Sequence, residues 1–77
     1  MPLNSNPYNL ADLQTANRHV AEGRRRVAQQ RRWIAEQEGA GQDTRLSDNV
    51  LNNFEITLRS MVEHRDRIAR EFDEISN

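Results

Sequence analysis

The sequence predicts an all-α protein: an antiparallel two-helix hairpin that dimerises into a four-helix bundle. Apolar residues recur at alternating spacings of three and four along two long stretches, as in helices that pack against helices. A glycine-containing segment, residues 38–44, separates the two stretches. Because so short a connection returns the second helix along the first, the two helices must run antiparallel.

Composition bounds the protein to one small domain of 77 residues, with 35% hydrophobic and 30% charged residues. The net charge of −1 gives no overall attraction to nucleic acid or to an acidic membrane. The absence of cysteine excludes disulfides and thiolate chemistry and is compatible with a reducing compartment. No apolar run approaches the roughly 20 residues that span a bilayer, so we expect a cytoplasmic protein with no membrane partner.

The first element should be a flexible N-terminal arm, residues 1–8, that is polar and contains two prolines. The helical hairpin then covers residues 9–77, and its first helix covers about residues 9–38. Asn6 or Asn9 can cap this helix, and Asp12 places a negative charge in its first turn.

Two kinds of position alternate along the seam of the first helix. Every second seam residue is a large apolar residue, and those between them are small or polar. Gly23 on this seam costs helix stability, so it is best explained as room for a bulky side chain of the second helix. The seam consists of Leu13, Ala16, Val20, Gly23, Val27, Gln30, Ile34 and Gln37.

The loop is expected at about residues 39–43, followed by the second helix at about residues 44–75. Gly39 or Gly41 can adopt the left-handed conformation that ends a helix. Asp43 or Thr44 can cap the helix that follows.

The second helix carries an apolar seam that a single arginine interrupts. Folding the chain about the loop pairs small residues of the first helix with large residues of the second, for example Gly23 with Leu58. The same alignment brings Arg24 and Arg31 near Glu55, and Trp33 near Val50. The seam consists of Leu51, Phe54, Leu58, Met61, Arg65, Ile68, Phe72 and Ile75.

The second helix has more apolar surface than the first helix can cover, because Leu46, Val50, Val62 and Ala69 widen its stripe. A chain of this size gains little from one thin core, which predicts a homodimer with these stripes inside. A helix of another protein would cover the same surface. The expected dimer or partner interface consists of Val50, Leu51, Phe54, Leu58, Met61, Val62, Arg65, Ile68 and Phe72.

Arg65 lies at a seam position, where an arginine costs stability unless it reaches a carboxylate or water. The favoured interpretation is a polar layer that fixes helix register and oligomeric state. The alternative is a contact with an anion or carboxylate, shared across the dimer.

His19, Glu22 and His64 are weak candidates for a metal site, because the two histidines flank the seam at a matching level. No strong metal-binding spacing accompanies them. A histidine that bonds a neighbouring carboxylate at the edge of the core is favoured, and we expect no metal and no cofactor. A metal-binding bundle is the third functional hypothesis.

An arginine run with an adjacent tryptophan offers a possible surface binding site: Arg24, Arg25, Arg31, Arg32 and Trp33. Such residues can contact phosphates and stack on bases. The second functional hypothesis is therefore an RNA- or DNA-binding four-helix bundle, by analogy of architecture with the Rop-like hairpin of plasmid copy-number control. A solvated, salt-bridged face is favoured, because consecutive helical residues fan out around the axis.

Part of the pattern also resembles a group of short helical-hairpin proteins of alphaproteobacteria such as the rhizobia. The resemblance implies a bacterial, cytosolic, all-helical protein, and it carries no established activity. The residues that carry it are Arg18 to Gly23, Arg26, Gln30, Ile34, Gly41, Asp43, Thr44, Leu51, Phe54, Leu58, His64 and Arg65.

The first functional hypothesis is a small non-enzymatic module for protein–protein interaction or regulation that acts as a homodimer. Two thin helices offer no pocket, no nucleophile beside a base and no glycine-rich phosphate loop, so no catalytic residue is expected. Its expected partners are itself and another protein; nucleic acid is disfavoured by the charge balance.

Overall fold

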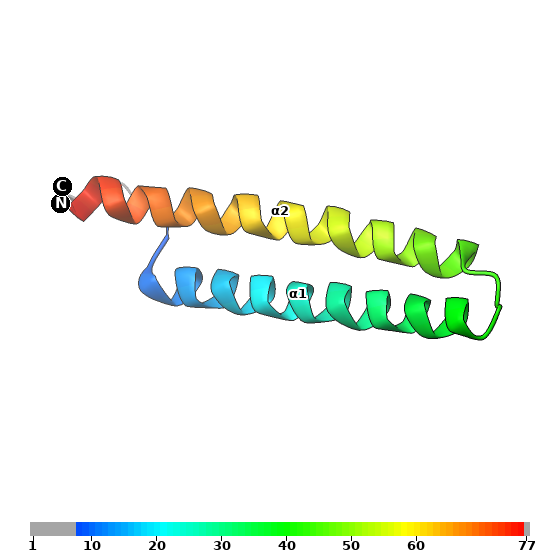
Figure 1. The fold of residues 1–77 in the computed structure, drawn as a ribbon. Coiled ribbons are helices and arrows are strands. Elements are labelled where there is room, and N and C mark those ends of the chain that lie inside the picture. Colours follow the sequence, from blue (N-terminus) through cyan, green and yellow to red (C-terminus); the bar gives the residue numbers. More distant parts are fainter. Residues whose placement is uncertain (1–7, 77) are drawn as a thin grey trace.

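The computed structural model describes residues 8–76, and the side chains of residues 8–73. In this range it has two helices, α1 (Leu10–Gly39) and α2 (Arg45–Ser76). They run antiparallel and side by side, joined at one end of the molecule (Figure 1). The predicted all-α hairpin is confirmed. Residues 1–7 of the predicted arm and the side chain of the seam residue Ile75 lie outside the described residues.

Each predicted helix boundary is one residue too early. Asn9 lies before α1 as its cap, because its side-chain Oδ1 accepts a hydrogen bond from the Asp12 backbone N–H at 2.9 Å. The Asn9 N–H in turn donates to Asp12 Oδ2 at 2.9 Å, which completes a capping box. Asn6, the other candidate cap, lies outside the described residues.

The connection between the helices depends on one glycine. Gly39 remains helical, whereas Gly41 has a φ of 72°, the left-handed conformation that a side chain disfavours. Its N–H donates to the Glu38 carbonyl at 3.0 Å, and the Gln42 N–H donates to the Gln37 carbonyl at 2.9 Å. These bonds satisfy the last carbonyls of α1, and the chain can then reverse direction.

The first turn of α2 is held by the two residues that the sequence singled out as caps. The Arg45 N–H donates to Asp43 Oδ1 at 3.0 Å, and the Asp48 N–H donates to the Thr44 carbonyl at 2.7 Å. The Arg45 side chain also donates to Asp43. The side-chain bonds and then the backbone bond from Arg45 hold the pKa of the Asp43 carboxyl below its ordinary value.

Polar seam residues of α1 near the loop find partners on α2. Gln30 Nε2 donates to the Ser47 carbonyl at 3.0 Å, and Ser47 Oγ donates to Gln37 Oε1. Both bonds cross the hairpin, so these two glutamines tie the loop end of α1 to the start of α2 without burying an unsatisfied amide.

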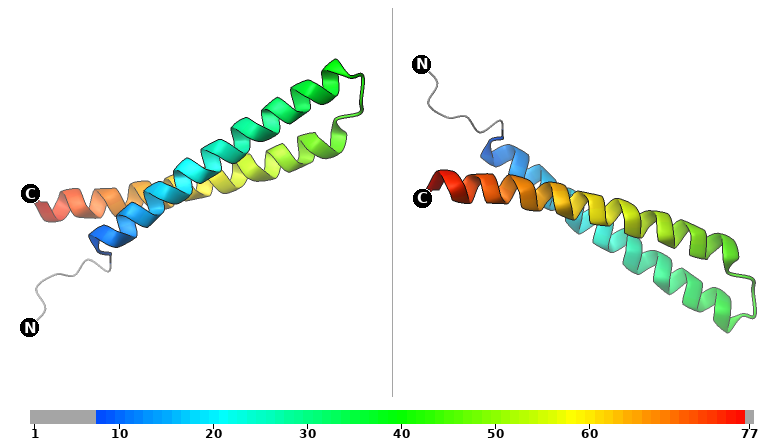
Figure 2. Two further views of the ribbon diagram at one scale, coloured as in Figure 1. Left: turned by 90° about the horizontal axis from the view of Figure 1, so that it is seen from below. Right: turned by 90° about the horizontal axis from the view of Figure 1, so that it is seen from above.

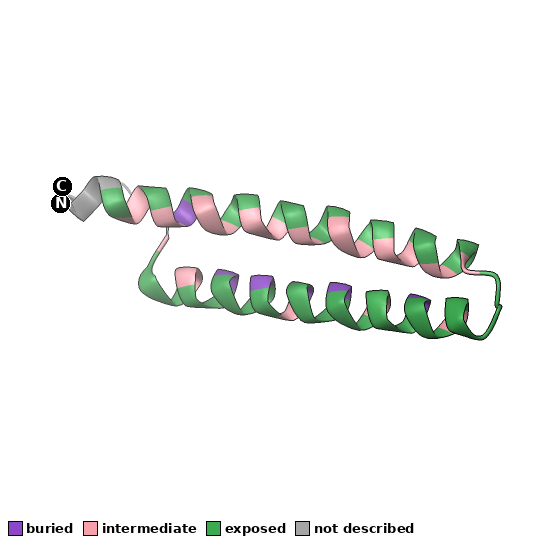
Figure 3. Cartoon of the chain, in the orientation of Figure 1, coloured by how far each residue is buried: buried purple, intermediate pink, exposed green. Residues whose placement is uncertain are grey.

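The core is a single seam between the helices, and its two sides are buried to different degrees. The side of α1 that faces α2 contains buried residues, whereas the facing side of α2 is mostly half-buried (Figure 3). Val20 and Ile68 are each 1% exposed. The residues of α1 that are buried are Ala16, Val20, Gly23, Val27 and Ile34.

Gly23 lies against Leu58, as the alignment of the two seams predicts. A Cβ added at Gly23 would lie 3.0 Å from Leu58 Cδ1 and 3.3 Å from Met61 Sδ. The missing side chain therefore lets large residues of α2 approach the α1 backbone. The two views of Figure 2 show that the helices cross obliquely. Neither helix, within the described chain, has the apolar length needed to cross a bilayer.

Candidate functional site

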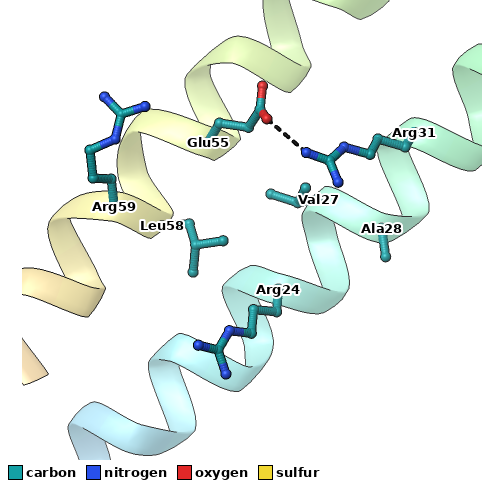
Figure 4. Close-up of a pocket in the computed structure, with 7 residues that line it drawn as sticks. All are labelled: Arg24, Val27, Ala28, Arg31, Glu55, Leu58 and Arg59. Atoms are coloured by element: carbon teal, nitrogen blue, oxygen red, sulfur yellow. Dashed lines mark hydrogen bonds and ion pairs between the residues drawn. The ribbon is translucent and has the colours of Figure 1, made fainter.

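A shallow groove of about 440 Å³ lies on one side of the seam, and we call it the arginine groove. Its floor is apolar, formed by Val27, Ala28 and Leu58. Side chains of opposite charge surround this floor, and they come from both helices (Figure 4). The complete lining is Arg24, Val27, Ala28 and Arg31 of α1, with Glu55, Leu58 and Arg59 of α2.

One ion pair spans the groove. Arg31 Nη2 lies 2.9 Å from Glu55 Oε2, and the two side chains are 62% and 39% exposed. An exposed pair of this kind stabilises a fold by about 0.2–1 kcal/mol, so its main effect is to hold two charges in place. The predicted approach of Arg31 to Glu55 is confirmed.

Two further arginines of the groove have no such partner. Arg24 of α1 and Arg59 of α2 lie on either side of Leu58 (Figure 4). Within the described part of the chain, neither makes a hydrogen bond or ion pair. The groove therefore holds three guanidinium groups and one carboxylate, a local excess of two positive charges above an apolar floor.

The arginine run of α1 does not form one surface. All four of its arginines are exposed, but only Arg24 and Arg31 line the groove. Arg25 and Arg32 follow these two by one residue each, and one helical residue turns the side chain by about 100°. They therefore belong to a different face of α1. Trp33 is 50% exposed and is absent from the groove.

The two histidines that the sequence predicts at a matching level, His19 and His64, lie close together toward the other end of the hairpin. His19 and His64 line the same hollow of about 310 Å³, together with Tyr8. The Tyr8 and His64 rings meet edge to face, with centroids 6.0 Å apart and planes at 80°. Glu22 does not line this hollow. Among the described residues, no three or more His, Cys, Asp or Glu side chains are grouped as metal ligands.

Arg65 finds partners within the hairpin. Its Nε donates to Asp66 Oδ1 at 2.7 Å, and its Nη1 donates to Asn17 Oδ1 of α1 at 3.1 Å. The side chain is 25% exposed, so the guanidinium reaches the edge of the seam while its stem packs inside it. One bond to α1 links the two helices at this level.

The expected interface residues of α2 remain partly open, with one exception. Ile68 is buried inside the hairpin, so it has almost no surface left for a partner. Outside this set, Leu46 is 78% exposed and Ile56 is 52% exposed. The half-buried members are Val50, Leu51, Phe54, Leu58, Met61, Val62, Arg65 and Phe72.

Two residues of these sites, Arg59 and Tyr8, are not among the residues that the sequence pattern singles out. The antiparallel alignment of the seams places Arg59 at the level of Glu22, so it gives no signal that Arg59 joins the groove. Tyr8 precedes the Asn9 cap, a position where an apolar side chain often packs beside its helix. Its contact with His64 depends on the second helix and has no local signal.

Comparison with known proteins gives no relative for this chain: no family model, no curated protein and no solved structure matches it.

Proposed function

We propose that the chain is a non-enzymatic protein–protein interaction module that acts as a homodimer. Two hairpins associate into a four-helix bundle, and the apolar stripe of α2 lies inside it. The interaction surface is then shared between the two copies, and the outer charged faces remain available to another protein.

The observation that supports this proposal is the unequal burial of the two seams. Five seam residues of α1 are buried, but Ile68 is the one fully buried apolar seam residue in the part of α2 with described side chains. The small side chains of α1 leave the flanks of large α2 residues, such as Phe54 and Met61, open to water. Covering apolar surface stabilises a complex by about 25 cal/mol per Å².

The extent of the stripe favours a partner near the loop. Leu46, Val50 and Phe54 follow each other at spacings of four, which places them along one side of α2; we call them the loop-end stripe. Leu46 is largely exposed, and Val50 and Phe54 are half-buried. Trp33 adds a half-exposed aromatic side chain near the same end of α1. Aromatic residues of this kind often anchor protein interfaces.

The test is size-exclusion chromatography with light scattering, and sedimentation equilibrium, over a tenfold range of concentration. We expect the mass of a dimer for the full chain. Val50→Glu should shift the protein toward the monomer, because it places a charge within the stripe. Circular dichroism should show the same helix content.

The matched control is Ile56→Glu, which makes the same change of charge at a half-exposed residue. Ile56 lies about 120° from Val50 and about 160° from Phe54 around the helix axis. This variant should remain a dimer. A full-length chain that is monomeric at every concentration, or equal effects of the two variants, would contradict the proposal.

A further inference from the structure

The arginine groove has the chemistry of a docking site that the hairpin itself does not fill. Arg31 is held by Glu55 at 2.9 Å, which fixes one rim of the groove. Arg24 and Arg59, which have no ion-pair partner among the described residues, also line the groove, together with the apolar Leu58. The whole chain has a net charge of −1, so this positive region is local rather than a property of the overall composition.

Guanidinium groups and an apolar floor together select one kind of ligand. A guanidinium fork binds a carboxylate through two parallel hydrogen bonds, and it does so best where surrounding apolar atoms exclude water. An aliphatic side chain between two such carboxylates would contact Val27 and Leu58. An amphipathic helix presents this pattern when apolar residues at spacings of three or four are flanked by Asp or Glu.

A second copy of this chain is a poor occupant of the groove. In a symmetric dimer with its twofold axis at the groove, Arg24, Arg31 and Arg59 of one hairpin would face the same arginines of the other. Each copy contributes only Glu55 to offset them. Like charges placed against one another disfavour such a complex. Nucleic acid is also disfavoured, because Glu55 and the apolar floor do not suit a phosphate backbone.

We propose that the arginine groove is the docking site for an acidic amphipathic helix of a different protein. An aliphatic side chain of that helix lies against Leu58, and its carboxylates pair with Arg24 and Arg59. This inference rests on the proposed interaction role but does not require self-association. Arg59 follows Val50 by nine residues, about two and a half helical turns, so these two side chains project from opposite sides of α2.

The test uses the full chain and two fluorescein-labelled, alanine-based helical peptides, followed by fluorescence anisotropy. The acidic peptide carries leucines at spacings of three and four with flanking glutamates, and the basic peptide has lysine in place of every glutamate. We expect the acidic peptide to bind with a Kd below about 100 μM at low salt, and the basic peptide to bind at least about tenfold more weakly. Added salt should weaken the binding.

The location is tested by two double variants with the same change of charge. Arg24→Glu with Arg59→Glu should weaken acidic-peptide binding at least about tenfold. Arg25→Glu with Arg67→Glu alters two exposed arginines outside the groove. This variant should change the affinity for the acidic peptide by less than about threefold. Circular dichroism checks that each variant keeps its helices.

The proposal is overturned if the acidic peptide does not bind, or if both double variants weaken it equally. It is also overturned if a 20-nucleotide single-stranded RNA binds more tightly than the acidic peptide and loses that binding in the Arg24 and Arg59 variant. Light scattering of the same samples reports self-association separately. A dimer that does not bind the acidic peptide would contradict this inference alone. A monomer that binds the peptide at the groove would contradict only the proposed homodimer.

Discussion

At position 23, one missing side chain determines how closely the two helices approach. A Cβ there would meet the ends of the Leu58 and Met61 side chains, at 3.0 and 3.3 Å. Both of these side chains are half-buried, so they can move slightly to admit a single methyl group. A branched side chain would need more space than this movement provides.

We therefore expect Gly23→Ala and Gly23→Val to differ in stability. Alanine gains about 1 kcal/mol of helix propensity, which offsets a small displacement of Leu58, so the free energy of unfolding should change little. Valine should destabilise the hairpin by about 1–3 kcal/mol, because its two methyl groups overfill the seam. Urea unfolding followed by circular dichroism measures both values. Equal stability of the two variants would show that the approach of α2 is not limited at this position.

Arg65 interrupts the apolar seam of α2, and its guanidinium group makes hydrogen bonds at the edge of that seam. The sequence predicts that a seam arginine needs a carboxylate or water, and the side chain reaches the neighbouring Asp66 as well as Asn17 on α1. The bond to Asn17 crosses the hairpin, as expected of a polar layer that fixes register. The proposed effect of Arg65 on oligomeric state remains a prediction.

At the scale of elements, the loop depends on the conformation of one of two nearby glycines. Gly41 has a positive φ, whereas Gly39 is the last residue of α1, and no atom outside the local backbone would meet a Cβ at either position. The difference between them is therefore one of backbone conformation rather than of space. They form a natural matched pair.

Gly41→Ala should destabilise the hairpin by about 1–2 kcal/mol, because an L residue in the left-handed region brings Cβ close to the carbonyl oxygen. Gly39→Ala should leave stability unchanged or raise it by up to about 1 kcal/mol, since alanine favours the helix. Thermal unfolding of the two variants in parallel measures the difference. A loop that tolerated both substitutions equally would mean that residue 41 can change its φ at no cost.

At the scale of the whole molecule, the hairpin has one seam and two different flanks. The flank with the arginine groove combines charge with a small apolar floor. The loop-end stripe, on the other flank of the seam, is apolar and partly open. We propose different occupants for the two flanks, because the first would repel its own copy and the second would not.

If the chain is a dimer, its thermal stability depends on protein concentration. Each tenfold increase in concentration adds about 1.4 kcal/mol to the free energy of the folded dimer. With the usual entropy of unfolding for two chains of this length, the midpoint should rise by roughly 4 °C. Scanning calorimetry at two concentrations measures the shift. A midpoint that does not move would indicate that one hairpin unfolds alone.

Much of the fold is predictable from local patterns in the sequence. The spacing of Val20 and Val27 marks the buried side of α1, and the Asn9 and Asp12 pair predicts its start. The sequence does not distinguish Gly39 from Gly41 as the turn residue, because either glycine can adopt a left-handed conformation. The helix starts differ from the expected ones by one residue, since cap residues lie outside the helix that they begin.

The candidate site is predictable only in part. The sequence brings Arg24 and Arg31 near Glu55 through the alignment of the seams, and the ion pair between Arg31 and Glu55 follows from that alignment. Arg59 joins them because the two helices meet at one particular rotation, which no local pattern specifies. The contact between Tyr8 and His64 has the same origin.

The sequence by itself determined that this chain forms two helices, where they turn and which residues face each other, because periodicity and turn chemistry act over a few neighbouring residues. Only the tertiary structure decided how completely each face is covered and which charges meet. Those outcomes depend on the crossing of the helices and on the sizes of facing side chains. The small residues of α1 are buried by α2, but they are too small to cover α2 in return.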